Sequence, residues 1–319
     1  MLLSIAICLM GLPFKLDAQV TVKRGMTLMG SRFEVTVIER DSVWANMYID
    51  SAVSEIRRIE NLISEWQPHT QVSAVNRAAG IKPVRVDREV FALTQRALAF
   101  SRLSDGAFDI SIAALDRIWR FDGSMDELPT PEAVQRSIAH VGYQDIVLDS
   151  VASSIYLARS GMKIGFGSIG KGYAADRGRD LLKRLGVQGG IVNASGDLST
   201  WGTQLNGQPW RVGINNPLKA HKMIAVLQMK EESVATSGSY EKYVEFGGKR
   251  YAHIINPKTG FPASGLISVT VYGPSAEFAN GLSTSMMVLG AREGAKLLRR
   301  FPAYKAVWMS DGGRVRRIR

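Results

Sequence analysis

The chain has 319 residues, of which 45% are hydrophobic and 22% are charged, and this balance excludes a largely disordered protein. Lys and Arg together exceed Asp and Glu by 11, but the basic residues are scattered and no recognition motif accompanies them, so we expect no nucleic-acid partner. Part of the excess lies in the C-terminal tail, which leaves solubility and a weak association with an anionic membrane surface or an acidic partner as alternatives. The basic residues of that tail are Arg314, Arg316, Arg317 and Arg319.

The chain begins with an apolar run over residues 2–14, which has the length of the hydrophobic region of a signal peptide and is too short to span a bilayer. No Lys or Arg precedes the run, although Ala18 or Gln19 is a suitable cleavage position. The single cysteine, Cys8, lies within it, so a processed chain would contain no disulfide. We therefore predict a signal peptide over residues 1–19 and an exported protein of the periplasm or cell envelope.

The first half of the remaining chain is predicted to contain one strand and three helices. Alternating apolar and polar residues predict a strand over residues 27–39. Apolar residues at helical spacing predict helices over residues 45–63, 90–102 and 130–140, the last of which opens with Thr-Pro.

From about residue 146 the pattern changes to short strands separated by turns. The predicted strands are IVLD, SIYLA, MKIGF, GGIVNAS, WRVGI, AVLQM, KYVEF and LISVTVYG, and helices interrupt them at residues 172–185 and 276–288. No repeat, low-complexity linker or Pro-rich hinge separates the two halves, and a domain boundary near residue 145 is only weakly marked. We therefore predict an α+β fold with mixed sheets and closely packed helices.

A glycine-rich stretch, IGFGSIGKGYAAD over residues 164–176, has the strongest chemical signal. Its glycines expose backbone N–H groups and Lys171 adds a positive charge, which together suit a diphosphate at the start of a helix. The spacing matches G-x-G-x-x-G and most of a P-loop, but the acidic residue of the first motif and the Ser or Thr of the second are missing. A glycine-rich turn that binds no ligand is the alternative.

Two later segments have polar residues in turn-rich surroundings. GGIVNASGDLSTWG runs a buried-type strand into Asn193, Ser195 and Asp197, which is typical either of a ligand-facing turn or of a tight hairpin. His253, in HIINPKTG, is the only one of four histidines within a polar, turn-rich signature. It is the best candidate for a general base, although a lone histidine is more often structural.

Asn280 and Thr284 lie four residues apart in a segment with helical spacing. A helix would place both side chains on one face, where they either share an oxygen-preferring cation such as magnesium or line a groove. A pair of hydroxyl residues, Thr236 and Ser237, also precedes a glycine in VATSGSYEKY.

Taken in order, these segments resemble the ApbE family of FAD:protein FMN transferases, from about residue 29 to residue 290. The shared motifs are MGS, S-x-W with Asn76 downstream, GAFDIS, GFGSIGKGYAADR, VNASGDL, VATSGSYEKY, HIINPKTG and the ANGLST helix. Several motifs at matching spacing are more specific than any single one. The resemblance implies an α+β, T-fold-like domain of the ApbE type over residues 25–311, which binds FAD with its diphosphate on Mg²⁺. It also implies transfer of FMN to a Thr or Ser of an exported or membrane-bound redox subunit, with release of AMP.

The resemblance also implies roles for individual residues. It assigns FAD binding to Met29, Trp66, Asp109, Lys171, Asn193, Ser195, Asp197 and His253. It assigns magnesium binding to Gly170, Asn280 and Thr284. His253 stands where the family has the histidine that takes a proton from the incoming hydroxyl, and a base is needed because a hydroxyl is a weak nucleophile at neutral pH.

Three positions depart from the family pattern, and each lacks an aspartate that is common there. Gly165 opens the glycine loop, Asn256 follows the histidine, and Asn280 stands where most members bind magnesium through a carboxylate. Loss of carboxylates weakens a site for a hard cation. A FAD pyrophosphatase that passes FMN to water, and a carrier that binds FAD without cleaving it, therefore stay open beside the transferase.

Overall fold

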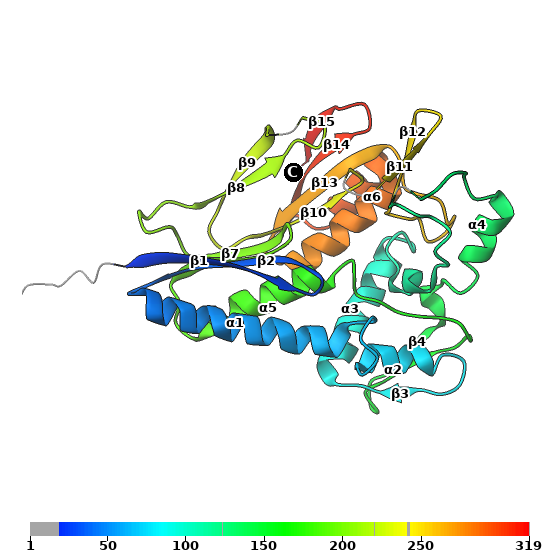
Figure 1. Ribbon diagram of the computed structural model, residues 1–319, viewed down its shortest axis with the longest axis horizontal. Coiled ribbons are helices and arrows are strands. Elements are labelled where there is room, and N and C mark those ends of the chain that lie inside the picture. Colours follow the sequence, from blue (N-terminus) through cyan, green and yellow to red (C-terminus); the bar gives the residue numbers. More distant parts are fainter. Residues whose placement is uncertain (1–18, 123, 220, 241–242, 319) are drawn as a thin grey trace, which may run out of the picture.

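A computed structural model describes residues 19–122, 124–219, 221–240 and 243–318, so the predicted signal peptide up to residue 18, with Cys8, and the terminal Arg319 lie outside the described residues. The centre of the fold is an antiparallel sheet of eight strands in the order β1-β2-β6-β7-β10-β13-β14-β15 (Figure 1). These strands are β1 (Val20–Leu28), β2 (Ser31–Glu39), β6 (Gly189–Ala194), β7 (Asp197–Trp201), β10 (Ser233–Gly238), β13 (Leu266–Gly273), β14 (Lys305–Ser310) and β15 (Val315–Ile318).

Three long helices pack against this sheet and bury the main core with it. Helix α1 (Ser42–Ile63) packs on β1 and β2, α5 (Gly170–Arg184) on β6 and β7, and α6 (Ala276–Leu298) on β10 and β13. In α1 the buried residues recur every three or four positions, so one face of the helix is apolar, and Asp41 caps its first turn by accepting from the backbone N–H of Trp44.

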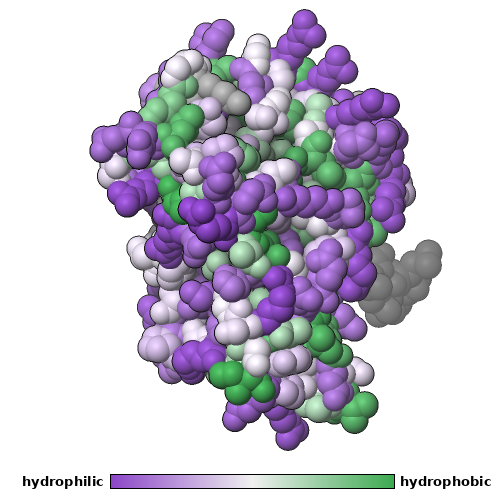
Figure 2. Space-filling model, turned by 90° about the vertical axis from the view of Figure 1, so that its right-hand side faces the viewer, coloured by the Kyte–Doolittle hydropathy of each residue, from purple (hydrophilic) through white to green (hydrophobic). Residues whose placement is uncertain are grey.

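Smaller layers flank the central sheet. The hairpin of β8 (Trp210–Asn215) and β9 (Met223–Met229) packs against side chains of β7, β10 and β13. The other short elements are α2 (Gln71–Arg77), β3 (Val84–Arg85), α3 (Arg88–Leu103), η1 (Ile110–Ala114), α4 (Pro131–Ser137), η2 (Tyr143–Asp145), β4 (Ile146–Asp149), β5 (Ser154–Leu157), β11 (Tyr243–Phe246) and β12 (Lys249–Ala252). On the face drawn in Figure 2 hydrophilic side chains predominate and apolar ones are scattered.

Most predicted helices and strands are present, and the differences have local causes. The segment predicted as one strand over residues 27–39 contains the end of β1, a turn and all of β2. Met29 and Gly30 both adopt positive φ and turn the chain between the two strands. Residues 162–166 (MKIGF) form no strand. The side-chain amide of Asn76 makes the backbone hydrogen bonds to Ile164 that a neighbouring strand would otherwise make. Its Oδ1 accepts from the N–H of Ile164 (2.8 Å) and its Nδ2 donates to the carbonyl of the same residue (3.0 Å).

Two helices end elsewhere than predicted. Helix α4 stops at Ser137, three residues before the predicted end at residue 140. Helix α6 continues past residue 288 to Leu298, although Gly290 has a non-helical conformation with φ 74° that breaks the helix into two parts.

The two halves of the sequence form a continuous structure. Strand β2 pairs with β6, and β3 pairs with β5, so two sheets draw strands from both sides of residue 145. The weakly marked boundary there is not a break in the fold. Among the residues that the structure describes, no helix combines the length and hydrophobicity needed to cross a membrane.

Candidate functional site

A cavity of about 920 Å³ is bordered by the glycine loop, the β6–β7 turn, β8, β10, β13 and α6. This volume is within the range of small-molecule sites, about 300–1,000 Å³. Eight of the eleven predicted site residues line it, and Met29, Trp66 and Gly170 do not. The eight are Asp109, Lys171, Asn193, Ser195, Asp197, His253, Asn280 and Thr284.

The glycine loop brings the N-terminus of α5 to the cavity. Gly167 and Ser168 of the loop and Lys171 of the first helical turn line the wall. No side chain caps this helix, so its positive end and the Lys171 ammonium are both available to an anionic ligand. The arrangement suits a diphosphate.

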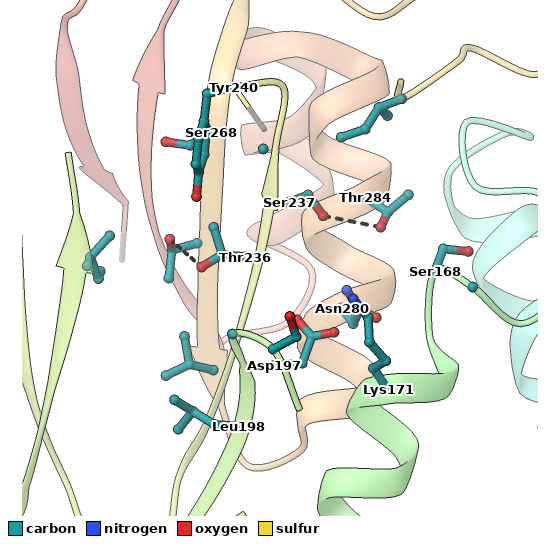
Figure 3. A pocket seen from close by; sticks show the side chains of 18 of the residues that line it. Ser168, Lys171, Asp197, Leu198, Thr236, Ser237, Tyr240, Ser268, Asn280 and Thr284 are labelled. Atoms are coloured by element: carbon teal, nitrogen blue, oxygen red, sulfur yellow. Dashed lines mark hydrogen bonds between the residues drawn. The ribbon is translucent and has the colours of Figure 1, made fainter. Parts of the chain in front are cut away.

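Asp197 is a buried carboxylate of the site, with 4% of its surface exposed. The side-chain amide nitrogen of Asn280 donates to the carbonyl of Ser168 (2.6 Å) and to Oδ2 of Asp197 (3.3 Å). Burial raises the pKa of Asp197 to about 7, and the nearby positive charge of Lys171 opposes this rise. Figure 3 shows Asp197, Asn280 and Lys171 pointing toward one another between β7, α6 and α5.

A set of hydroxyl groups continues the wall along β10. Ser237 Oγ lies 3.3 Å from Thr284 Oγ1 on α6, and Thr236 Oγ1 lies 2.8 Å from Thr270 Oγ1 on β13 (Figure 3). Successive residues of a strand point to opposite faces of the sheet, so Ser237 faces α6 on one face, while Thr236 lies beside Thr270 of the neighbouring strand β13. The VATSG segment is therefore a strand and forms part of the wall.

The oxygen donors around Asn280 fit a hard cation that is shared with phosphate. Asp197 supplies a carboxylate, Asn280 an amide oxygen and Thr284 a hydroxyl. Mg²⁺ is commonly held by one or two carboxylates together with substrate phosphates. Within the described part of the chain, no three His, Cys, Asp or Glu side chains gather into a metal site.

Asp109 and Asn193 line the cavity, but their side chains also accept hydrogen bonds from other groups of the protein. Asp109 accepts from the backbone N–H and the hydroxyl of Ser111, both at 2.7 Å, and from the N–H of Tyr143 at 2.9 Å. Burial raises the pKa of Asp109, and the hydrogen bonds from Ser111 oppose this rise. These contacts fix the start of η1 beside the cavity.

The β6–β7 turn resolves one of the alternatives left by the sequence. Ser195 and Gly196 both have positive φ, and Asn193 Oδ1 accepts from the N–H of Gly196 (2.9 Å). The connection is thus a tight two-residue hairpin. It also lines the cavity, so the hairpin and the cavity-facing turn are the same feature.

His253 follows β12 and lines the cavity with an exposed side chain. Its ring meets the ring of Phe121 edge-on, with 6.5 Å between the ring centroids. In the turn that follows, Asn256 Oδ1 accepts from the N–H of Lys258 (2.9 Å), and the carbonyl of Asn256 accepts from the N–H of Gly260 (2.9 Å). An aspartate at this position would make the same turn contact, so Asn256 is accounted for by the turn.

Gly165 is explained by a neighbouring carboxyl group. A Cβ atom at this position would lie 2.8 Å from Oε1 of Glu65 and 3.0 Å from Cβ of Ala113. Burial raises the pKa of Glu65. The space that an aspartate side chain would need at residue 165 is therefore already occupied by another acid.

The three predicted residues that do not line the cavity have other surroundings. Met29 is in the β1–β2 turn and packs against the main core, and its Cε would lie 3.6 Å from a Cβ atom at Gly170. Trp66 is 71% exposed, and the guanidinium of Arg117 lies 4.6 Å from its ring centroid. Neither Trp66 nor Met29 is among the residues that line the cavity.

Several wall residues had no signal in the sequence. Lys23 and Glu34 form an ion pair of 2.7 Å across β1 and β2, and Arg211 and Asn215 come from β8. They reach the cavity only through the pairing and packing of the strands, which no local sequence pattern specifies. Tyr240 also lines the cavity, and the VATSGSYEKY motif that contains it predicts no role for it.

Comparison with known proteins adds an independent result. The model of the ApbE family matches residues 29–308. The chain is 33% identical over 285 residues to a FAD:protein FMN transferase of Klebsiella pneumoniae (strain 342), which covers 89% of this chain and 87% of that protein. It is 30% identical over 309 residues to a FAD:protein FMN transferase of Treponema pallidum (strain Nichols), with 92% and 85% covered.

Solved structures give the same result for the fold. The crystal structure of the ApbE protein of Thermotoga maritima matches with a TM-score of 0.85 and 29% identity, covering 94% of this chain and 97% of that one. The apo form of the flavinyl transferase ApbE of Pseudomonas stutzeri matches with a TM-score of 0.82 and 28% identity, covering 94% and 95%. The predicted α+β fold is confirmed.

Proposed function

This chain belongs to the ApbE family, and on that premise we propose that it is a FAD:protein FMN transferase. It cleaves FAD and transfers the FMN half to a hydroxyl of a target protein, releasing AMP. The observation that supports this function best is that the glycine loop, His253 and the Asn280/Thr284 face of α6 all line one cavity.

The α5 end of the cavity is suited to the diphosphate of FAD. The positive end of α5 and the Lys171 ammonium would attract its charge. Lys171 would stabilise the charge that develops on the phosphoryl oxygens as the bond between the two phosphates breaks.

We assign magnesium binding to Asp197, Asn280 and Thr284, together with oxygens of the FAD diphosphate. When bound, Mg²⁺ would neutralise the diphosphate and favour the departure of AMP. A single carboxylate is enough for this arrangement because the substrate supplies the remaining negative charge.

His253 acts as the general base in this proposal. The hydroxyl oxygen of a target Thr or Ser attacks the phosphorus of the FMN phosphate, and its proton passes to His253. The bond from that phosphorus to the bridging oxygen breaks, and AMP leaves with the bridging oxygen. Exposure of His253 at the cavity wall supports this role because the target must enter from outside.

The test is an incubation of the purified protein with FAD and Mg²⁺, with and without a purified target subunit that carries no flavin. We expect AMP release and in-gel fluorescence of the target, both abolished by chelation of the metal. Free FMN and AMP without a labelled target would instead identify a pyrophosphatase. Bound, unchanged FAD would identify a carrier.

We also propose that the target is an exported or membrane-bound redox subunit and that this protein is exported to the same compartment. The apolar run over residues 2–14 supports export. Cell fractionation with N-terminal sequencing of the periplasmic protein tests this. Recovery of the full-length chain in the cytoplasmic fraction alone would contradict it.

A further inference from the structure

A second hollow, of about 760 Å³, lies between the last part of α6 and the edge of the central sheet, and the proposed reaction does not use it. Its walls are lined by six basic residues, and we call it the basic groove. The basic residues are Arg292 and Lys296 on α6, Arg299 at its C-cap, Arg314 before β15, and Arg316 and Arg317 on β15.

The positive charge of the basic groove is largely unpaired. Glu293 lies 2.8 Å from Lys296 and 3.7 Å from Arg292. Over the residues that the structure describes, the other four basic side chains make no ion pair with any carboxylate: Arg299, Arg314, Arg316 and Arg317. So many neighbouring cations repel one another, and an anionic partner would relieve that repulsion.

The floor of the groove is apolar and one wall is the edge of the sheet. The floor includes Ala291, Ala295, Trp308 and Ile318. Strand β15 is the last in the sheet order, so its outer edge pairs with no other described strand. Free N–H and C=O groups at such an edge can bind an extended peptide as an additional strand.

The groove is next to the catalytic cavity along α6. Val288 lines the cavity, and Ala291 lines the groove three residues later, just beyond the break in α6 at Gly290. A protein segment in the groove would therefore lie close to the point where the acceptor hydroxyl must arrive.

We propose that the basic groove binds an acidic, extended segment of the protein that accepts FMN. The acidic side chains face the arginines, the backbone pairs with the edge of β15, and apolar side chains cover Trp308 and Ile318. The identity of the partner as the acceptor rests on the proposed function, whereas the preference for an acidic extended peptide rests on the groove alone. Arginines on a sheet edge also discourage pairing between copies, but that role gives no preference for acidic over neutral peptides.

A fluorescein-labelled peptide of alternating Glu and Thr is the probe, and its binding is measured by fluorescence anisotropy. We expect it to bind about ten-fold or more tightly than the matched peptide of alternating Gln and Thr, with affinity that falls as salt rises. The D-enantiomer of the Glu peptide should bind more weakly than the L form, because it cannot pair normally with β15. Equal binding of the Glu and Gln peptides, or no binding, would overturn the proposal.

The variant that tests the groove is Arg314→Gln/Arg316→Gln/Arg317→Gln, in which only exposed side chains change. We expect its affinity for the Glu peptide to fall by about ten-fold or more. Its release of AMP from FAD should stay unchanged, because none of these residues lines the catalytic cavity. Loss of peptide binding with unchanged cleavage of FAD would show that the groove binds peptide independently of the catalytic cavity, so the two proposals can fail separately.

The matched control is Arg57→Gln/Lys82→Gln/Arg102→Gln, which removes the same charge at exposed positions outside the groove. We expect its affinity to stay within about two-fold of the unchanged protein. An equal loss in both triple variants would show that only net charge matters and would overturn the proposal. Sedimentation with phosphatidylglycerol vesicles that depends on the groove, without peptide binding, would assign the groove to a membrane and overturn it as well.

Discussion

His253 is the residue whose proposed role is easiest to isolate, because its side chain is exposed at the cavity wall. We expect His253→Ala to bind FAD normally but to label the target about 10²–10⁴ times more slowly, which is the range for loss of a general base. Flavin fluorescence quenching measures binding, and in-gel fluorescence measures labelling. His69→Ala, at an exposed position away from the cavity, is the control. Undiminished labelling by the His253 variant would remove this residue from the mechanism.

In the proposed magnesium site, Asn280 is the position that sets whether one or two carboxylates face the cation. In Asn280→Asp a second carboxylate would lie about as close to Oδ2 of Asp197 as the amide nitrogen now does, at 3.3 Å. We expect this variant to melt at a lower temperature than the unchanged protein without metal, and to gain more stability on addition of Mg²⁺. Thermal unfolding across a Mg²⁺ titration measures both. If the titration does not differ between the two proteins, the side chain does not face the metal.

Asp197 gives a prediction for pH. Its pKa is raised in the folded state from its ordinary value of 3.8 to about 7, mainly by burial. Between these two pH values the folded chain holds a proton that the unfolded chain releases, so the free energy of unfolding should decrease as pH rises from about 4 to 7. In Asp197→Asn this decrease should be smaller, and the ligand-free protein should be more stable by about 1–4 kcal/mol at pH 8.

The measurement for Asp197 is urea unfolding at several pH values. Asp126→Asn, at an exposed position, is the control and should keep the pH dependence of the unchanged protein. Identical pH profiles for the Asp197 variant and the unchanged protein would mean that burial does not hold this carboxyl group protonated.

At the level of secondary structure elements, Asp176 of α5 joins the two helices that form the site. Its carboxylate accepts from the backbone N–H groups of Ala276 and Glu277, both at 3.0 Å, and from the hydroxyl of Ser275 at 2.7 Å. It also accepts from the hydroxyl of Ser199 on β7 at 2.7 Å. The start of α6 is therefore fixed to α5 and to the sheet by one side chain.

We expect Asp176→Ala to lower the free energy of unfolding by about 3 kcal/mol or more, because several buried donors lose their acceptor. The start of α6 would shift, so FAD affinity should fall even though Asp176 does not line the cavity. Urea unfolding and FAD titration measure the two effects. Asp180→Ala on the same helix is the control. A stable variant with reduced FAD affinity would instead indicate direct contact with the ligand.

Helices with an apolar face were predictable from the sequence, whereas several strands were not. The predicted helices over residues 45–63 and 90–102 agree with α1 and α3 to within three residues, because their buried residues recur at helical spacing. Strand β7 is buried at every position and contains Asp197, Ser199 and Thr200, so it shows no alternation of apolar and polar residues. Its place in the sheet depends on its neighbours, which the local sequence does not describe.

The whole cavity is assembled from distant parts of the chain. Glycine, asparagine and histidine motifs predicted the cavity residues that come from loops and from α6. Binding a diphosphate, binding a cation and accepting a proton each require particular residue types, so such motifs can be recognised in the sequence. The wall contributed by β1, β2 and β8 followed only from the order of the strands. Trp66 was predicted from the resemblance alone, and the structure gives it an exposed position outside the cavity.

A ligand that touches so many elements should stabilise the whole molecule at once. With FAD at about 100 times its dissociation constant, the free energy of unfolding should rise by about 2.7 kcal/mol. Tryptophan fluorescence and far-UV circular dichroism should report one shared urea transition, because both sheets draw strands from either side of residue 145. Two separate transitions would indicate that the halves unfold independently.

The break in α6 at Gly290 divides the helix into two parts that line different hollows. In one straight helix, a shift of either part would move the other. Asn280, Thr284 and Val288, before the break, line the cavity, and Ala291 and the residues after it line the basic groove. Mutations beyond residue 290 can therefore accumulate without altering the position of Asn280 and Thr284. Relatives that differ in the part of α6 after residue 290 would then bind different target proteins while keeping the same chemical step.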